Sequence, residues 1–210
     1  MEGKRMSCCS TGLDVLVTRE APDFTAPAVM GDGSTGEVTL SAFRGSYVVL
    51  FFWPLDNTFV CPTEIIAFDK RLDQFKQRGC EVLGVSIDSA FSHIAWREKP
   101  VAQGGIGPVA YPMIADIKHE ICRAYGVQHP NGPALRASFL IDKNGVVRHQ
   151  VVNDLPLGRN IDEMLRMVDA LKFFEENGEV CPAGWSTGDD AMKPSAAGVA
   201  DYLSSNAETL

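Results

Sequence analysis

The 210-residue sequence predicts a single α/β domain, a three-layer sandwich, followed by a C-terminal arm. A strand-then-helix order occurs three times from residue 47 onward, and this order is typical of parallel strands joined by crossover helices. Two further strands then flank Lys143-Asn144-Gly145, a strong signal for a hairpin, and one long helix follows. Everything after Asn177-Gly178 is polar and interrupted by glycine and proline, which indicates an arm rather than core.

The elements can be assigned in order along the chain. The first thirty-odd residues show no periodic pattern, and we expect them to be irregular and extended. Residues 47–53 are continuously apolar, which predicts a strand buried on both faces, and Pro54 ends it. A helix follows, because apolar residues recur at helical spacing until Arg78-Gly79 closes it. These residues are Ile65, Phe68, Leu72 and Phe75.

The rest of the domain continues the alternation and then changes to a hairpin. The predicted elements are a strand at 81–87, a helix capped by Asp88 or Ser89 and ending at Trp96, a strand at 112–115, a helix capped by Asp116 that carries Ile117, Ile121 and Tyr125, and hairpin strands at 137–142 and 146–151. The last helix of the domain begins at Asn160, with Glu163 three residues later as a variant of the capping box.

Composition excludes several classes of protein. Charged residues make up 22% and hydrophobic residues 45%, close to the globular average, so the chain is not mostly disordered. The net charge of −8 argues against general nucleic-acid binding. No apolar run approaches the roughly 20 residues that span a bilayer, and residues 6–12 do not form the apolar core of a signal peptide. We therefore expect a soluble, cytoplasmic protein.

Six cysteines raise the question of metal or redox chemistry. They are Cys8, Cys9, Cys61, Cys80, Cys122 and Cys181. No Cys-x-x-Cys occurs and no histidine stands at ligand spacing from a cysteine, so we expect neither a metal nor another cofactor. In a reducing compartment most cysteines are small buried hydrophobes, and we assign this role to Cys80 and Cys122. The role of Cys8 and Cys9, in the N-terminal segment, is left open.

Cys61 occupies a position that suits a reactive thiol. It lies between a buried strand and a helix whose first residue is predicted to be Pro62. The unpaired N–H groups and the positive end of the helix dipole favour a thiolate there. This is also the carboxyl edge of a parallel strand, where open α/β sheets place their sites. A cysteine that merely caps the helix remains the alternative on position alone.

The residues around Cys61 and those around Cys181 together resemble the typical two-cysteine peroxiredoxins, in particular the bacterial alkyl hydroperoxide reductase C group. Pro54-x-x-x-Thr58-x-x-Cys61, followed by Pro62-Thr63-Glu64, is similar to that family's active-site pattern. Residues 178–185, Gly-Glu-Val-Cys-Pro-Ala-Gly-Trp, resemble its resolving-cysteine pattern. Arg136 and Arg159 stand where the family has two active-site arginines. The resemblance runs from about residue 22 to 185 and continues weakly to the C-terminus.

This resemblance implies a thioredoxin-like fold, with 1–20 as a flexible N-terminal extension, 21–177 as the peroxidase domain and 178–210 as the arm. It implies a thiol peroxidase that reduces hydrogen peroxide and organic hydroperoxides through a sulfenic acid at Cys61, which then forms an intersubunit disulfide with Cys181. It also implies a homodimer that assembles into a decamer. The electron donor would be a dithiol protein, either thioredoxin or a flavoprotein disulfide reductase.

The same resemblance assigns roles to the other site residues. Lowering the pKa of a thiol raises its thiolate fraction but lowers its nucleophilicity, so acidification alone explains only a few-fold in rate. The site must also stabilise the breaking O–O bond. Thr58 and Arg136 would supply the donors, and Pro54 would shield the sulfur. Glu64 would orient Arg136 and Arg159. Thr58, Glu64 and Arg136 each have an ordinary structural role as the alternative: a helix-entry cap, a first-turn carboxylate favoured by the helix dipole, and a solvated strand residue.

Two departures from the family pattern, and two other functions, remain to be weighed. Residues 104–107, Gly-Gly-Ile-Gly, resemble an insertion of easily overoxidised members, whose C-terminal helix carries Tyr-Phe. Here Tyr202-Leu203 stands instead, so we predict intermediate overoxidation. Asn57 replaces a frequent aromatic residue. A general disulfide oxidoreductase would normally need Cys-x-x-Cys, and nothing in the sequence encodes the client binding of a chaperone.

Overall fold

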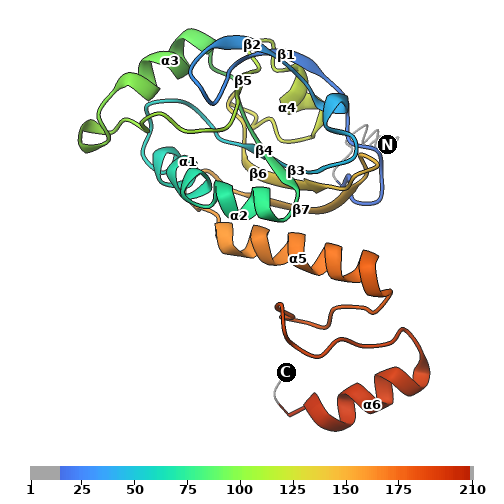
Figure 1. Ribbon diagram of the computed structural model, residues 1–210. Coiled ribbons are helices and arrows are strands. Elements are labelled where there is room, and N and C mark those ends of the chain that lie inside the picture. Colours follow the sequence, from blue (N-terminus) through green and yellow to red (C-terminus); the bar gives the residue numbers. More distant parts are fainter. Residues whose placement is uncertain (1–14, 209–210) are drawn as a thin grey trace, which may run out of the picture.

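A mixed seven-stranded sheet, in the order β2-β1-β5-β4-β3-β6-β7, forms the centre of the computed structural model, which describes residues 15–208 (Figure 1). The strands are β1 (Thr25–Val29), β2 (Thr35–Thr39), β3 (Tyr47–Phe52), β4 (Cys80–Ser86), β5 (Met113–Ala115), β6 (Arg136–Ile141) and β7 (Val147–Asn153). The helices are α1 (Cys61–Lys70), α2 (Leu72–Gln77), α3 (Ala90–Glu98), α4 (Glu120–Ala124), α5 (Ile161–Asn177) and α6 (Ala196–Asn206). As predicted, β3, β4 and β5 are parallel, and β6 and β7 form an antiparallel hairpin.

Alternate residues of β3 serve two separate cores. Val49 and Phe51 pack on the face that α1 and α5 cover, and Phe51 stacks on Phe68 of α1 with ring centroids 4.1 Å apart. Leu50 and Phe52 pack on the opposite face, where α4 lies. Because successive side chains of a strand point to opposite faces, one continuous apolar run supplies both cores. This arrangement confirms the predicted three-layer α/β architecture.

The sequence predicted an irregular N-terminal region. This prediction is wrong for the segment that contains β1 and β2. Strands β1 and β2 form an antiparallel hairpin, and β1 also pairs with β5. Pro27 is accommodated because it pairs with Glu37 of β2, whereas the pairing with β5 reaches only Ala28 and Val29. Before the hairpin, residues 15–20 run beside β7, and the Thr18 N–H donates to the Val147 carbonyl (2.8 Å). Cys8 and Cys9 lie outside the described residues.

The helix predicted from Ile65 to Phe75 is two helices. The chain leaves helical geometry at Arg71, with φ −107° and ψ 3°, between α1 and α2. The Arg71 guanidinium donates to the carboxylate of Asp162 in α5. The apolar spacing continues across the break, so the sequence pattern could not show it.

The helix predicted from Asp116 begins later, at Glu120. The Asp116 carboxylate nevertheless caps it, because it accepts the backbone N–H groups of Ile121 (3.1 Å) and Cys122 (2.8 Å). Ile117 is therefore outside the helix, with 59% of its surface exposed.

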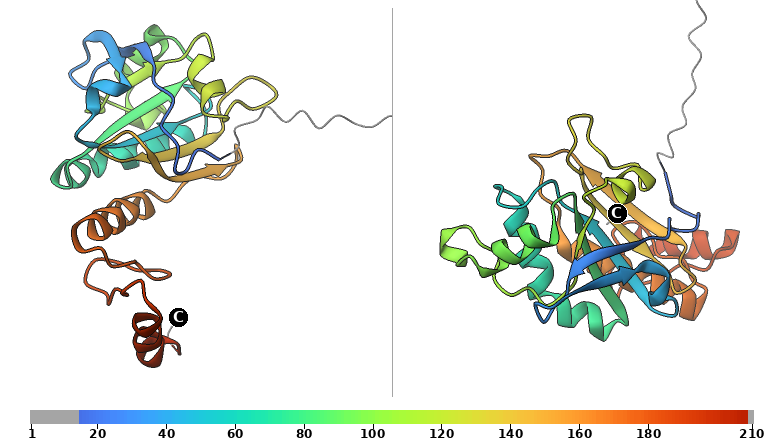
Figure 2. Two further views of the ribbon diagram at one scale, coloured as in Figure 1. Left: turned by 90° about the vertical axis from the view of Figure 1, so that its right-hand side faces the viewer. Right: turned by 90° about the horizontal axis from the view of Figure 1, so that it is seen from above.

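The arm leaves α5 and places α6 beyond it, away from the sheet (Figures 1 and 2). One arm residue, Trp185, is nevertheless buried, and its ring packs against Phe173 of α5 with centroids 4.8 Å apart. Arg166 of α5 donates to the Trp185 carbonyl (2.6 Å). In contrast, α6 buries none of its residues within the described chain. No helix between residues 15 and 208 has the length and apolarity needed to cross a membrane.

Candidate active site

Cys61 is the first residue of α1, at the end of the loop 54–60 that follows β3. The helix therefore starts one residue earlier than predicted, and Pro62 lies in its first turn, where a missing N–H costs nothing. The Cys61 side chain is fully buried. The predicted position of the thiol, at a helix N-terminus beyond the carboxyl end of a parallel strand, is thus the observed one.

Two polar side chains contact the sulfur of Cys61. The Thr58 hydroxyl Oγ1 lies 2.9 Å from Sγ, and the Arg136 guanidinium Nη1 lies 3.3 Å from it. Thr58 Oγ1 also lies 2.8 Å from the carbonyl oxygen of Leu55. The sulfur is therefore buried but not in an apolar environment, because a cation and a hydroxyl both face it. A cationic donor at this distance stabilises a negative charge on sulfur.

Glu64 links the two predicted arginines. Its carboxylate accepts hydrogen bonds from Arg136 Nη1 (2.8 Å) and from Nε and Nη2 of Arg159 (2.8 and 3.0 Å). Burial alone would raise the pKa of Glu64, but the hydrogen bonds and charge of Arg159, with the charge of Arg136, outweigh it and hold the pKa below its usual value. Arg136 Nε donates to the Leu155 carbonyl (2.6 Å). The cation beside Cys61 is therefore fixed from two sides.

Cys181 does not meet Cys61 within one chain. Both are free thiols, and Cys181 lies against α5, where its Sγ is 3.5 Å from the Ala170 carbonyl oxygen. Burial raises the pKa of the Cys181 thiol, and the charge of Arg166 opposes this only in part. Pro54, at the start of the active-site loop, is buried. The structure thus brings Thr58, Arg136, Glu64 and Arg159 together around Cys61 and leaves Cys181 apart.

Cys80 and Cys122 are buried, in β4 and α4. Burial raises the pKa of both thiols, which leaves them as inert thiols at neutral pH. Within residues 15–208, no group of three or more His, Cys, Asp and Glu side chains is arranged to hold a metal ion.

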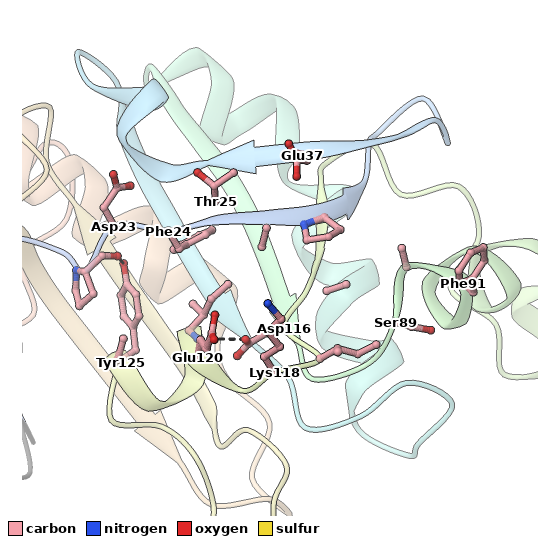
Figure 3. A pocket seen from close by; sticks show the side chains of 18 residues that line it. Asp23, Phe24, Thr25, Glu37, Ser89, Phe91, Asp116, Lys118, Glu120 and Tyr125 are labelled. Carbon is pink, nitrogen blue, oxygen red and sulfur yellow. Dashed lines mark hydrogen bonds between the residues drawn. The ribbon is translucent and has the colours of Figure 1, made fainter.

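A cavity of about 660 Å³ lies elsewhere, between β1, the first turn of α3, and α4 (Figure 3). Phe24 and Tyr125 contribute apolar surface, and Asp23, Glu37 and Glu120 are among the acidic residues around it. None of the predicted site residues lines this cavity. Its size therefore does not identify it as the reaction site, since the thiol and its donors lie elsewhere.

The sequence reasoning missed a buried polar cluster behind the active-site loop. The carboxylate of Asp56 accepts hydrogen bonds from Trp53, Ser92 and His93, and both Asp56 and His93 are buried. One signal was available: His93 stands three residues before Trp96 on a short helix, so both side chains lie on its buried face. Nothing in the sequence indicated that Asp56 is its partner.

Comparison with known proteins identifies the family of the chain. Residues 17–150 match the model of the AhpC/TSA family, and residues 170–205 match the C-terminal domain of 1-Cys peroxiredoxin. The chain is 60% identical to alkyl hydroperoxide reductase C of Helicobacter pylori strain J99, over 91% of this chain and 98% of that protein. It is 52% identical to peroxiredoxin-2 of Mus musculus, over 90% of this chain and 95% of that protein.

Solved structures give the same result. The reduced 2-Cys peroxiredoxin of Plasmodium vivax superposes with a TM-score of 0.89 at 51% identity, covering 90% of this chain and 99% of that one. The fold is therefore the thioredoxin-like fold of the peroxiredoxins, as predicted. With a family model that matches most of the domain and relatives of more than 50% identity over nearly the whole chain, this protein belongs to the AhpC/TSA family of peroxiredoxins.

Proposed function

We propose that this peroxiredoxin reduces hydrogen peroxide and organic hydroperoxides at Cys61. The observation that carries the proposal is the sulfur of Cys61 lying within hydrogen-bond reach of both Thr58 and Arg136. The thiolate attacks one peroxide oxygen, an S–O bond forms and the O–O bond breaks. The products are a sulfenic acid on Cys61 and an alkoxide or hydroxide, which takes a proton to become alcohol or water.

The surrounding residues suit the breaking O–O bond. Negative charge moves from sulfur to the departing oxygen, so donors that already point at this space stabilise the transition state without reorganising. Arg136 donates from Nη1 to the sulfur and to Glu64 and from Nε to the Leu155 carbonyl, which leaves Nη2 to donate to the peroxide. Glu64 and Arg159 act as its support, and Pro54 helps to exclude water from the thiolate.

Cys181 supports a second step between two subunits. Its thiol condenses with the sulfenic acid of Cys61, an S–S bond forms, and water leaves. The two thiols lie apart in one chain, and no residue of α6 is fully buried within the described residues, which favours an arm that reaches a partner subunit. The assembly is a homodimer that builds a decamer. A dithiol protein, thioredoxin or a flavoprotein disulfide reductase, reopens the disulfide in the cytoplasm.

Cysteine variants test both steps. Cys61→Ser should abolish peroxide turnover, whereas Cys181→Ser should permit one turnover with a small-thiol reductant and block recycling by a protein reductant. Cys80→Ala is the control, since its thiol is buried away from the site and turnover should persist. Peroxide consumption by Cys61→Ser at the wild-type rate would refute the proposal. Non-reducing electrophoresis after one equivalent of peroxide should show a dimer, and a monomer band would exclude the intersubunit disulfide.

A further inference from the structure

Asp56 is the centre of a buried polar cluster that joins three elements. Its Oδ1 accepts from Nε1 of Trp53 (3.0 Å), the residue just after β3, and its Oδ2 accepts from Ser92 Oγ (2.7 Å) and from His93 Nδ1 (2.8 Å) in α3. Its backbone N–H donates to the Asp88 carboxylate (2.9 Å), just after β4. None of these atoms touches Cys61, so the cluster has no direct part in the chemistry.

Every polar atom of the Asp56 side chain is satisfied within this cluster. Three donors converge on its carboxylate, and only 8% of the residue is exposed. The Asp88 carboxylate behind it is held in turn by Ser86 Oγ (2.8 Å). A fully bonded buried carboxylate fixes its own backbone, because leaving any of its partners unpaired costs free energy. Asp56 therefore anchors the middle of the loop 54–60.

The anchored backbone holds the carbonyl that controls Thr58. Leu55 immediately precedes Asp56, and its carbonyl oxygen lies 2.8 Å from Thr58 Oγ1, which is 2.9 Å from the Cys61 sulfur. A hydroxyl has one proton and two lone pairs. When Thr58 gives its proton to the Leu55 carbonyl, its lone pairs remain free to accept a hydrogen bond from the O–H of a peroxide beside the sulfur. The position of this carbonyl thus decides whether Thr58 acts as an acceptor.

We propose that Asp56 and His93 are positioning residues for the peroxide reaction, which act by holding the Leu55 carbonyl where it accepts the Thr58 proton. The inference rests on the proposed peroxidase function and deepens it. It predicts that these two side chains strongly influence the rate at which Cys61 reacts with peroxide. They should influence a reaction of Cys61 that does not use the Thr58 hydroxyl, such as alkylation, much less.

A double-mutant cycle tests the proposal on the full-length protein. Asp56→Asn should lower the second-order rate constant of Cys61 with hydrogen peroxide by about tenfold, the equivalent of one lost hydrogen bond in the transition state. Thr58→Val removes the hydroxyl through which Asp56 acts. In the Thr58→Val background, Asp56→Asn should therefore cost no more than about twofold, because the two effects share one interaction. If the rate loss of the double variant equals the product of the two single losses, the two residues act independently and the proposal is overturned.

Alkylation of Cys61 by iodoacetamide separates positioning from general damage. It needs an open loop but no aligned hydroxyl, so Asp56→Asn should leave alkylation unchanged or faster while the peroxide rate falls. Asp116→Asn is the matched control, an equally buried carboxylate that caps α4 instead. It should change neither rate. Equal losses of both rates in Asp56→Asn would show a structural role only and reject the proposal.

Substitutions of His93 provide an independent test if Asp56→Asn does not fold. His93→Asn keeps a donor near the position of Nδ1, whereas His93→Leu fills the same space without one. His93→Asn should retain most of the peroxide rate, and His93→Leu should lose severalfold; equal rates for the two variants would contradict the proposal. A wild-type protein that consumes no peroxide would instead refute the proposed function, which keeps the two failures distinct.

Discussion

The guanidinium of Arg136 bridges the sulfur of Cys61 and the carboxylate of Glu64, because its Nη1 lies 3.3 Å from the first and 2.8 Å from the second. Both partners of the ion pair are buried. A buried carboxylate shared by two arginines offsets one of their two positive charges and lowers the cost of burying both in a medium of low dielectric constant. Glu64 therefore both stabilises the fold and aims the cation at the thiol.

Replacing Glu64 should impair stability and rate together. Glu64→Gln leaves two buried cations without their counter-charge, so we expect a loss of about 3 kcal/mol in the free energy of unfolding. We also expect the rate of Cys61 with peroxide to fall at least about tenfold, because Arg136 loses one of its two fixed partners. Urea denaturation and stopped-flow mixing measure the two effects. Asp162→Asn, which breaks the exposed pair with Arg71, should cost less than about 1 kcal/mol.

The pairing of Glu64 with Arg136 and Arg159 makes the stability of the fold depend on pH, and the direction of this dependence follows from the pKa of Glu64. The pKa of Glu64 is lowered in the folded protein, since Arg159 and Arg136 outweigh the effect of burial. Its contribution to stability is then fully present above the unfolded pKa of about 4.3 and is lost as the pH falls through the lower folded pKa. The stability difference between wild type and Glu64→Gln should therefore shrink below about pH 4.3. A difference that stays constant on acidification would speak against the pairing.

Asn57 should control how often the active-site loop opens. It is exposed and has φ 55°, in the left-handed region that asparagine tolerates and β-branched residues do not. Asn57→Val should destabilise the closed loop by about 1–2 kcal/mol and so raise the alkylation rate of the buried Cys61 by about 5–30-fold. Asn57→Gly, which adopts positive φ freely, is the control and should react much more slowly than Asn57→Val. Identical alkylation rates would mean that backbone strain at this residue is unimportant.

The sequence was most informative where function depends on adjacent residues. Thr58, Cys61 and Glu64 lie on one short segment. Pro62 placed Cys61 at a helix N-terminus, and the resemblance to the peroxiredoxins added the roles of Thr58 and Glu64. The contact between Asp56 and His93 spans 37 positions, and no local pattern encodes it. The strand β1 was missed because Pro27 argues locally against a strand. It is tolerated because the pairing of β1 with β5 includes only Ala28 and Val29.

Trp185 holds the C-terminal arm against α5, and we expect this contact to affect disulfide formation with Cys181 but not the reaction of Cys61 with peroxide. The indole is buried against Phe173, and Arg166 holds the adjacent carbonyl. Trp185→Ala should release the arm without unfolding the domain, because local units open at lower free energy than the whole. The peroxide rate of Cys61 should stay at the wild-type value. Disulfide formation with Cys181 should slow about tenfold, as the effective concentration of the thiol falls. Quenched-flow mass spectrometry follows both steps, and unchanged disulfide formation would argue against docking.

The C-terminal helix should set sensitivity to overoxidation. Val199 and Leu203 of α6 lie four residues apart, so they share one face of the helix, and both are exposed within their own chain. We expect this face, in the proposed dimer, to cover the partner's active-site helix. A larger apolar side chain there would bury more surface and hold the first turn of α1 closed for longer. Leu203→Phe should therefore delay disulfide formation and raise the fraction of sulfinic acid at Cys61 at high peroxide, measured by mass spectrometry during turnover. Leu203→Ala should lower that fraction below wild type, and the opposite order of the two variants would place α6 elsewhere.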